Sequence, residues 1–307
     1  LQSLKQTFIY GDEKTGVLGG IKKTGRSAEE LEDLWADVEA FASYGFNKSH
    51  AAAYSMVTII EAWLFTNYPE YFAAADLNKV GGNQKTTERE ALHEMIEFYK
   101  SRGLDIRPVD INISEDEFVA DNGAVYFGLN KVSNVASAAE RISNERKTRG
   151  EFKNLYDFLS RMQRNHEKGV NKSVLKSLIV SGGFDNLSGT RKDKLEKLED
   201  LSNLGKILKA NESIIFDKYG ENYFDTWMNY KNEEMDIQDL LAEEKRVTSF
   251  YISGHPTEKY LSVAQKESDY QPIGNLDSLS SGTSVYLLGI VNSVRQITTK
   301  TGQLMAF

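Results

Sequence analysis

A polar turn between two apolar segments is the first feature of the sequence that could do chemistry. Within FASYGFNKSHAAAYSMV, residues 41–57, Asn47, Lys48, Ser49 and His50 place an amide, an ammonium, a hydroxyl and an imidazole side by side. Lys48 could neutralise a phosphate charge. Ser49, close to a helix start, could cap that helix or bind a phosphate oxygen. A purely structural alternative stays open, in which Ser49 only caps the helix and His50 packs beneath the preceding one.

Charge is spread unevenly along the chain. The 307 residues carry a net charge of −8, which argues against a uniformly basic nucleic-acid binder. Residues 141–176 nevertheless hold ten Lys or Arg and four Asp or Glu, a balance of +6, so the remainder carries −14. This basic middle segment is either a solvated charged surface or a binding site for a polyanion.

The composition limits the other classes of site. Cysteine is absent, which excludes disulfides and thiolate zinc sites and fits a reducing, cytoplasmic location. The four histidines, His50, His93, His166 and His255, are far apart, and no metal-binding spacing links them. No apolar run reaches the roughly 18 residues that span a bilayer, and no secretory leader is visible, so we expect no membrane partner.

The elements that position these residues are mostly helical. Ser27 and Glu30 form a capping box before a helix whose apolar face would end at Gly45. The next helix runs from Ser49 towards Pro69 and is apolar nearly all round, so we expect it to be buried on several sides. A Gly-rich break at 78–87 precedes another helix at 88–102.

A change of pattern after residue 104 predicts a small β insertion, with Asn122-Gly123 as a hairpin turn. Helical patterns return at 134–149, 154–162, 171–187, 190–208 and 237–254. Residues 209–236 lose periodicity and resemble a linker or a loosely packed extension. The last segment, 284–307, is a β pattern that stops after two strands, so we expect a piece of a longer protein.

Several stretches, read in chain order, resemble the bacterial replicative DNA polymerase III alpha subunits. The resemblance covers essentially the whole chain. Each stretch alone is a weak signal, and their shared order makes the resemblance specific. They are YGFNKSHAAAYSM, residues 62–77, FYKSRGLDIRPVDINISEDEF, YFGLNKVSNV, EFKNLYDFLSRM, NKSVLKSLIVSGGFDNL and SFYISGHPTEKYL.

The resemblance implies a mainly α (α+β) architecture in four parts. These are the end of a fingers domain at 1–80, a little-finger domain with tandem helix-hairpin-helix elements and a small β insertion at 81–210, a clamp-peptide linker with a connecting helix at 211–268, and the start of an OB fold at 269–307. It implies a DNA-directed DNA polymerase that uses Mg²⁺. The chain offers no Asp-x-Asp on a strand, so we expect the catalytic palm to lie elsewhere and this part alone to be inactive.

The implied partners are primer-template DNA, deoxynucleoside triphosphates, a sliding clamp and other replicase subunits. The turn of Asn47, Lys48, Ser49 and His50 would face the nucleotide, with the His50 ring against the sugar. Two alternatives stay open: a non-catalytic helix-hairpin-helix module of a repair or replication factor, and a protein-interaction scaffold.

The hairpins are the implied duplex-binding elements, because amides at the start of a hairpin's second helix hold a phosphate. In the first hairpin the Gly-x-Gly turn positions correspond to Asn134 and Ala136, a departure from the pattern, since Ala tolerates the left-handed region poorly. The predicted contacts across both hairpins are Lys131, Ser133, Asn134, Lys172, Lys176, Gly182 and Gly183. Gly182 and Gly183 could instead form a plain helix C-cap.

A short peptide, NESIIFD at 211–217, corresponds to the family's clamp-docking peptide. Glu212 stands where the family has glutamine, and Ile215 and Phe216 keep the apolar pair. An exposed Ile-Phe pair in a polar linker would be unusual without a partner, and local packing is the alternative.

Overall fold

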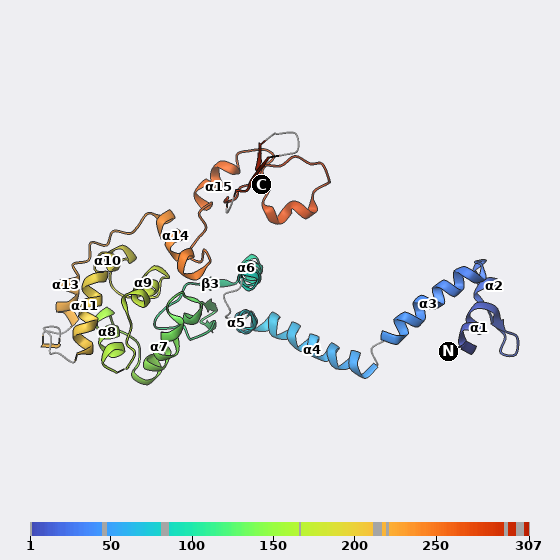
Figure 1. Ribbon diagram of the computed structural model, residues 1–307, viewed down its shortest axis with the longest axis horizontal. Helices are drawn as coiled ribbons and strands as arrows, with labels where there is room; N and C mark the ends of the chain where they lie inside the picture. Colours follow the sequence, from blue (N-terminus) through green and yellow to red (C-terminus); the bar gives the residue numbers. More distant parts are fainter. Residues whose placement is uncertain are drawn as a thin grey trace. The chain divides into compact units, whose positions relative to one another are not determined.

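The computed structural model describes residues 2–44, 48–80, 86–165, 167–210, 217–218, 221–291, 294–298 and 304–306. It contains two compact units, Leu1–Asn67 and Tyr68–Phe307, which are described separately (Figure 1). Helices dominate both units, and the only β-structure in the described ranges is a set of short strands. The predicted mainly α architecture with a small β insertion is confirmed.

The first unit is a small helical assembly around one short hairpin. Glu30 donates its backbone N–H to the Ser27 Oγ at 3.2 Å and accepts the Ser27 N–H at 2.8 Å, which confirms the predicted capping box. Leu31 and Trp35 follow on one face of that helix and are buried, as is Ile9. The elements are α1 (Gln2–Tyr10), β1 (Gly11–Asp12), β2 (Val17–Leu18), α2 (Gly20–Thr24), α3 (Ala28–Tyr44) and α4 (Lys48–Asn67).

The expected burial of the apolar helix α4 is not found. Tyr54, Met56, Ile59 and Trp63 are each more than half exposed. An apolar composition favours burial of the helix. It does not identify the segment or partner that would cover the helix. The same holds for the outer face of α3, where Phe41 is exposed although it falls on the predicted apolar face.

The second unit begins with two helices and a three-stranded sheet. Its elements are α5 (Pro69–Lys79), α6 (Thr86–Ser101), β3 (Asp105–Arg107), β4 (Val119–Asp121) and β5 (Ala124–Tyr126), with the sheet order β3-β5-β4. β4 and β5 are antiparallel and turn at Asn122 and Gly123, which have φ of 47° and 79°, so the predicted hairpin is confirmed. β3 pairs with β5 in parallel. Asn78 of α5 exchanges two 2.9 Å hydrogen bonds with the Phe118 backbone, which holds α5 against the sheet.

A helical layer follows the sheet and contains most of the core. Its elements are η1 (Leu129–Lys131), α7 (Ala136–Arg149), α8 (Leu155–Arg164), α9 (Lys172–Val180), α10 (Arg191–Glu196) and α11 (Leu198–Lys209). Asn154 and Asn171 cap α8 and α9, and Thr190 forms a capping box with Asp193. The helix predicted over 171–187 ends at Val180 because Gly182 adopts a positive φ of 90°. Phe158 contacts both Phe152 and Phe184, with ring centroids about 5 Å apart.

The prediction of a linker or a loosely packed extension over 209–236 is wrong for residues 221–236. Phe224 and Met228 of α13 (Glu221–Met228) are buried, and residues 229–236 form a strap that is hydrogen bonded to α10. The sequence pattern gave no sign of the strap, because hydrogen bonds of its backbone and of the Glu234 carboxylate hold it in place rather than an apolar face. The elements that follow are α14 (Ile237–Thr248), α15 (Glu258–Ala264), η2 (Ile273–Ser278), β6 (Gln296–Thr298) and β7 (Leu304–Ala306).

The β pattern near the C-terminus forms one antiparallel pair, in which Gln296 faces Ala306. The OB barrel stays a prediction. Across the described ranges, none of the helices has the length and apolar character that crossing a membrane requires.

Candidate nucleic-acid interface

The first hairpin connects η1 to α7 through residues 132–135. Asn134 adopts the left-handed conformation, with φ of 67°, as its predicted turn position requires. Ala136 is the first residue of α7, so it has a helical backbone and the expected strain at this alanine does not arise. Asn134 and Ala136 are both exposed, whereas Ala138 and Ala139 in the first turn of α7 are buried, so only the very start of this 14-residue helix lies at the surface.

The Ser133 amide is used inside the fold. It donates to the carbonyl of Val247 at 2.7 Å, which ties the hairpin to the end of α14. The Asn134 side chain donates to the Ser177 Oγ of α9 at 3.1 Å. The hairpin is therefore fixed against α9, the helix that carries Lys172 and Lys176, and the structure brings these predicted residues onto neighbouring elements. Lys131 ends η1 just before the turn and is half-buried.

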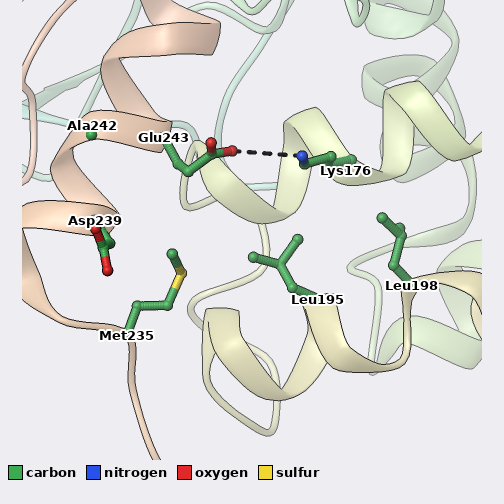
Figure 2. Close-up of a pocket in the computed structure, with 7 residues that line it drawn as sticks. All are labelled: Lys176, Leu195, Leu198, Met235, Asp239, Ala242 and Glu243. Atoms are coloured by element: carbon green, nitrogen blue, oxygen red, sulfur yellow. Dashed lines mark ion pairs between the residues drawn. The ribbon is translucent and has the colours of Figure 1, made fainter.

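Lys172 and Lys176 each face a carboxylate that the sequence did not reveal. Lys172 pairs with Glu199 of α11 and holds the pKa of that carboxyl below its usual value. Lys176 lies 3.7 Å from Glu243 of α14, and both line a cleft of about 480 Å³ together with Leu195 (Figure 2). Both lysines remain about half exposed, so each pair is open to solvent and readily exchanged.

The +6 balance of residues 141–176 overstates the free positive charge. Arg146 is buried and donates to the backbone carbonyl groups of 111, 113 and 114 and to Glu115. Arg161 pairs with Glu145 at 3.1 Å and with Asp157 at 3.3 Å. These arginines fasten helices to loops. The charge count over residues 141–176 did not reveal that these arginines are paired, because partners such as Glu115 lie outside that segment.

Gly182 and Gly183 form a helix cap in the structure. Their amides donate to the carbonyl groups of Ile179 and Leu178, at 3.2 and 2.8 Å. The Gly183 carbonyl also accepts the N–H of Ile111 at 2.8 Å. A Cβ on Gly182 would lie 2.6 Å from the Arg191 Nη2. Both amides are thus engaged within the protein, in agreement with the capping alternative.

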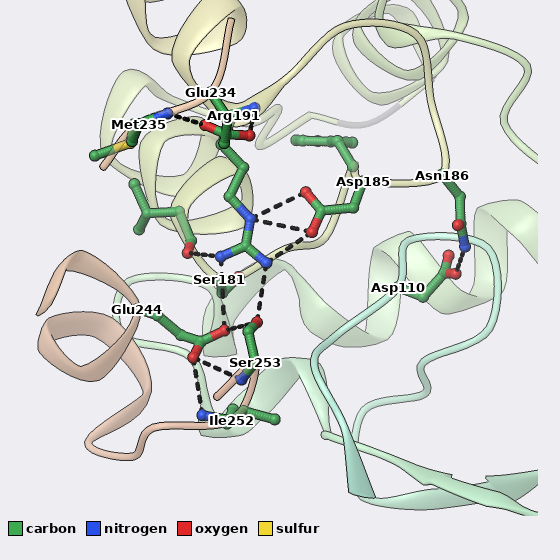
Figure 3. A network of polar contacts seen from close by, with 12 residues as sticks. Asp110, Ser181, Asp185, Asn186, Arg191, Glu234, Met235, Glu244, Ile252 and Ser253 are labelled. Carbon is green, nitrogen blue, oxygen red and sulfur yellow. Dashed lines mark hydrogen bonds and ion pairs between the residues drawn. The ribbon is translucent and has the colours of Figure 1, made fainter. Parts of the chain in front are cut away.

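Arg191 is the centre of a buried polar network behind this cap (Figure 3). Its guanidinium donates to Asp185 at 2.7 Å, to the Val180 carbonyl at 3.0 Å and to the Ser253 Oγ at 3.3 Å. Glu244, which is fully buried on α14, lies 3.6 Å from the Arg191 Nη1 and accepts the Ser253 N–H at 2.9 Å. The network fixes the start of α10 and the residues before it against α14.

The strap supplies the anion at the start of α10. The Glu234 carboxylate accepts the N–H groups of Arg191 and Lys192 at 3.0 and 3.2 Å. Thr190 donates its hydroxyl to the Glu233 carbonyl at 2.7 Å. The first amides of α10 are therefore already bound to a carboxylate, and a phosphate would have to displace Glu234 to reach them.

Lys194 is a fully buried lysine that the sequence analysis did not single out. Its ammonium donates to the carbonyl groups of Phe184, Leu187 and Gly189, at 2.8, 3.3 and 2.5 Å. Burial lowers its pKa to about 8. These three hydrogen bonds hold the loop between α9 and α10 in one conformation. A lone lysine in a charged run carries no signal that would identify it.

The remaining predicted residues belong to the first unit or fall outside the described residues. Lys48 begins α4, Ser49 is exposed on its first turn, and the half-buried His50 ring lies 4.4 Å from the Tyr54 ring. Asn47 and the proposed clamp residues Glu212, Ile215 and Phe216 lie outside the described residues. Among the described residues, no group of three or more His, Cys, Asp or Glu could hold a metal ion.

Comparison with known proteins gives a consistent result. A family model described as a helix-hairpin-helix motif matches residues 103–194. The chain is 33% identical over 304 residues to the DNA polymerase III subunit alpha of Borreliella burgdorferi, covering 96% of this chain and 26% of that protein. It is 30% identical to the protein of the same name from Aquifex aeolicus, covering 98% and 24%, and 33% identical to that from Deinococcus radiodurans, covering 98% and 22%. The chain spans about a quarter of the length of these relatives.

Proposed function

We propose that this chain, which is homologous over nearly its whole length to DNA polymerase III alpha subunits, contributes duplex binding to a template-directed DNA polymerase. The observation that carries the proposal is the helix-hairpin-helix match at 103–194, within which Asn134 forms a left-handed turn before the exposed start of α7. Amides at such a helix start bind phosphate without reading sequence.

The proposed duplex-binding surface consists of Lys131, Asn134, Lys172 and Lys176. The hydrogen bond from Asn134 to Ser177 keeps the hairpin beside α9. When the turn binds one phosphate of a DNA strand, the lysines of α9 would therefore lie near the next phosphates of that strand. The Glu199 and Glu243 carboxylates would be exchanged for phosphates on binding. Because neutralising phosphates releases counterions, affinity should fall steeply with salt.

Salt-titrated fluorescence anisotropy on a labelled primer-template duplex tests this surface. Lys172→Gln with Lys176→Gln should weaken binding equally for all sequences and reduce the salt slope by roughly one for each phosphate that is no longer neutralised. Glu199→Gln should have the opposite effect, because it releases Lys172 from its ion pair. Unchanged affinity of the double lysine variant at low salt would place the DNA-binding surface elsewhere.

A matched control separates this site from the general effect of net charge. Lys231 and Glu196 form an ion pair that is about as exposed as that of Lys172 and Glu199. Glu196→Gln makes the same change in net charge but frees a lysine on the strap. If it raised duplex affinity as much as Glu199→Gln does, the effect would come from net charge alone.

The turn before α4 is proposed to face the incoming nucleotide. The support is the resemblance of FNKSH to the relatives, together with the position of Lys48, Ser49 and His50 on the first turn of α4. In a full-length relative carrying this section, His50→Ala should relax discrimination against ribonucleotides, since the ring is proposed to stand where a 2′-hydroxyl would be. Unchanged sugar selectivity in single-nucleotide incorporation would return His50 to a packing role against Tyr54.

A clamp-docking peptide is proposed at Glu212, Ile215 and Phe216. An apolar pair that fills a pocket is the usual anchor of such a peptide, and truncating it should cost about 2 kcal/mol or more of binding. Ile215→Ala with Phe216→Ala should abolish binding to the cognate clamp and leave the thermal midpoint unchanged, and Glu212→Gln should strengthen binding because an amide can donate a hydrogen bond. A large loss of thermal stability with intact clamp binding would assign the pair to the fold.

The remaining proposals concern the longer relatives. The polymerase reaction and its Mg²⁺ are assigned to carboxylates in the section of the relatives that this chain does not span. The domain limits at 80, 210 and 268, the cytoplasmic location and the other replicase subunits as partners follow from the same homology and are part of the proposal.

A further inference from the structure

A second cation shares the carboxylate that faces Lys176. Arg246 lies in the last turn of α14 and is exposed. Its Nη2 is 2.8 Å and its Nε is 3.2 Å from the carboxylate oxygens of Glu243, one turn earlier in the same helix. Lys176 of α9 lies 3.7 Å from that same carboxylate (Figure 2). Glu243 therefore joins two cations that belong to different helices.

The first hairpin contacts both of these helices beside the two cations. Its turn donates one hydrogen bond at 3.1 Å to Ser177, the residue after Lys176. It donates another at 2.7 Å to the carbonyl of Val247, the residue after Arg246. Ser177 and Val247 are both buried, so packing holds these contacts in place. A DNA strand with one phosphate at the turn would therefore bring its next phosphates towards both cations.

The packing of α14 fixes the side on which its charged residues are exposed. Leu241 and Val247 are buried, and the fully buried Glu244 lies 3.6 Å from the Arg191 Nη1. Arg246, on the outer side, is about half exposed. Its hydrogen bonds lower the pKa of the Glu243 carboxyl, which is therefore ionised at neutral pH. An anion thus occupies the position between the two cations.

We propose that Lys176 and Arg246 form a two-cation phosphate site, which the Glu243 carboxylate occupies until a DNA phosphate displaces it. Arg246 is then a further DNA-binding residue, and it lies outside the matched range 103–194. The inference rests on the proposed duplex binding by the hairpin. A guanidinium can donate two parallel hydrogen bonds to a phosphate. Exposed ion pairs are weak, and the release of counterions from DNA favours the exchange.

Salt-titrated fluorescence anisotropy on the full chain and a labelled primer-template duplex tests Arg246. Arg246→Gln should weaken binding roughly three- to tenfold for every sequence and reduce the salt slope by roughly one. Arg246→Lys keeps the charge and should restore most of the affinity. Arg102→Gln is the control, because it removes the same charge from an exposed arginine that follows α6, and it should leave the salt slope unchanged.

A double-mutant cycle tests whether Glu243 competes with the phosphate. Glu243→Gln should raise duplex affinity. In that background Arg246→Gln should cost roughly threefold more affinity than it does in the wild type, because Arg246 no longer has to leave an ion pair. Equal losses in the two backgrounds would overturn the role of Glu243.

The outcomes for Arg246 and for the lysines of α9 are distinguishable. If Lys172→Gln with Lys176→Gln weakens binding but Arg246→Gln has no more effect than Arg102→Gln, the two-cation site is overturned and the proposed duplex-binding surface stands. The ion pair with Glu243 would then only stabilise α14. If neither the lysine variant nor Arg246→Gln weakens binding, both proposals are overturned.

Discussion

The buried Lys194 gives the protein a pH dependence that can be worked out from the structure. Its pKa is lowered from 10.5 to about 8 in the folded protein, because burial disfavours the ammonium. Between these two values the unfolded chain binds one more proton than the folded protein, so the free energy of unfolding rises with pH. Below the folded value both states are protonated, and burying the charge costs about 3 kcal/mol.

Raising the pH from about 7 to about 9.5 should recover about 2 kcal/mol of that cost. The perturbation is Lys194→Met, which removes the titrating group and should abolish this gain. Urea unfolding of the wild type and of Lys194→Met at several pH values between about 7 and about 9.5 measures this gain. The two proteins are compared by the slope of the free energy of unfolding against pH, not by its value at one pH. The absolute level also contains the hydrogen bonds that Met cannot make to Phe184, Leu187 and Gly189.

Lys192→Met is the control, because Lys192 is a half-buried lysine in the same helix whose ammonium reaches the surface and pairs with the exposed Glu233. It should show the wild-type dependence on pH. If the stabilities of the wild type and Lys194→Met ran parallel from about pH 7 to about pH 9.5, the three carbonyl groups would compensate the buried charge fully. The reasoning from burial would then be refuted.

Three further changes test α9, α10 and the loop between them. Arg191→Met leaves the buried carboxylate of Glu244 without its cation, and should lower the free energy of unfolding by about 3–5 kcal/mol in urea titration; a loss below about 1 kcal/mol would mean that the network is solvated. Gly182→Ala combines a positive φ with a Cβ only 2.6 Å from the Arg191 guanidinium, so the free energy of unfolding should fall by about 1–3 kcal/mol, and an unchanged thermal midpoint would contradict the cap geometry. Asn171→Ala removes the cap of α9 and should cost about 1 kcal/mol, whereas Asn171→Asp should keep most of it.

Local chemistry predicted the elements well where neighbouring residues determine the structure. Ser27 and Glu30 lie three positions apart, and Asn122-Gly123 forms a two-residue turn, so each signal is complete within a short window. Asn134 likewise takes the left-handed conformation within its own hairpin. The family resemblance added the order of these elements, and the comparisons agree with it.

Long-range pairing could not be predicted from the sequence. Lys172 looked like a free cation because Glu199 is 27 positions away, and nothing in the helical pattern of 190–208 singled out Lys194, which is fully buried. The apolar character of α4 was visible, but what covers it was not. For Lys172 the missing information was the identity of a distant partner, which a pattern along one chain does not encode. The carbonyl groups that bind Lys194 lie within ten positions of it, but backbone acceptors are present in every sequence and leave no signal in the pattern.

The strap and α14 make the helix-hairpin-helix region dependent on residues that are synthesised later. The Arg191 N–H binds the carboxylate of Glu234, 43 positions further on, and its guanidinium binds the hydroxyl of Ser253, 62 positions further on. These hydrogen bonds can form only after both partners have been synthesised. During translation the first amides of α10 and a buried guanidinium therefore remain exposed after the matched motif has left the ribosome. Contacts between residues that are far apart in the sequence form slowly. Until they form, the exposed surface can aggregate or bind a polyanion. A nascent chain ending at Lys209 should consequently be more prone to proteolysis than one that extends through Ser253.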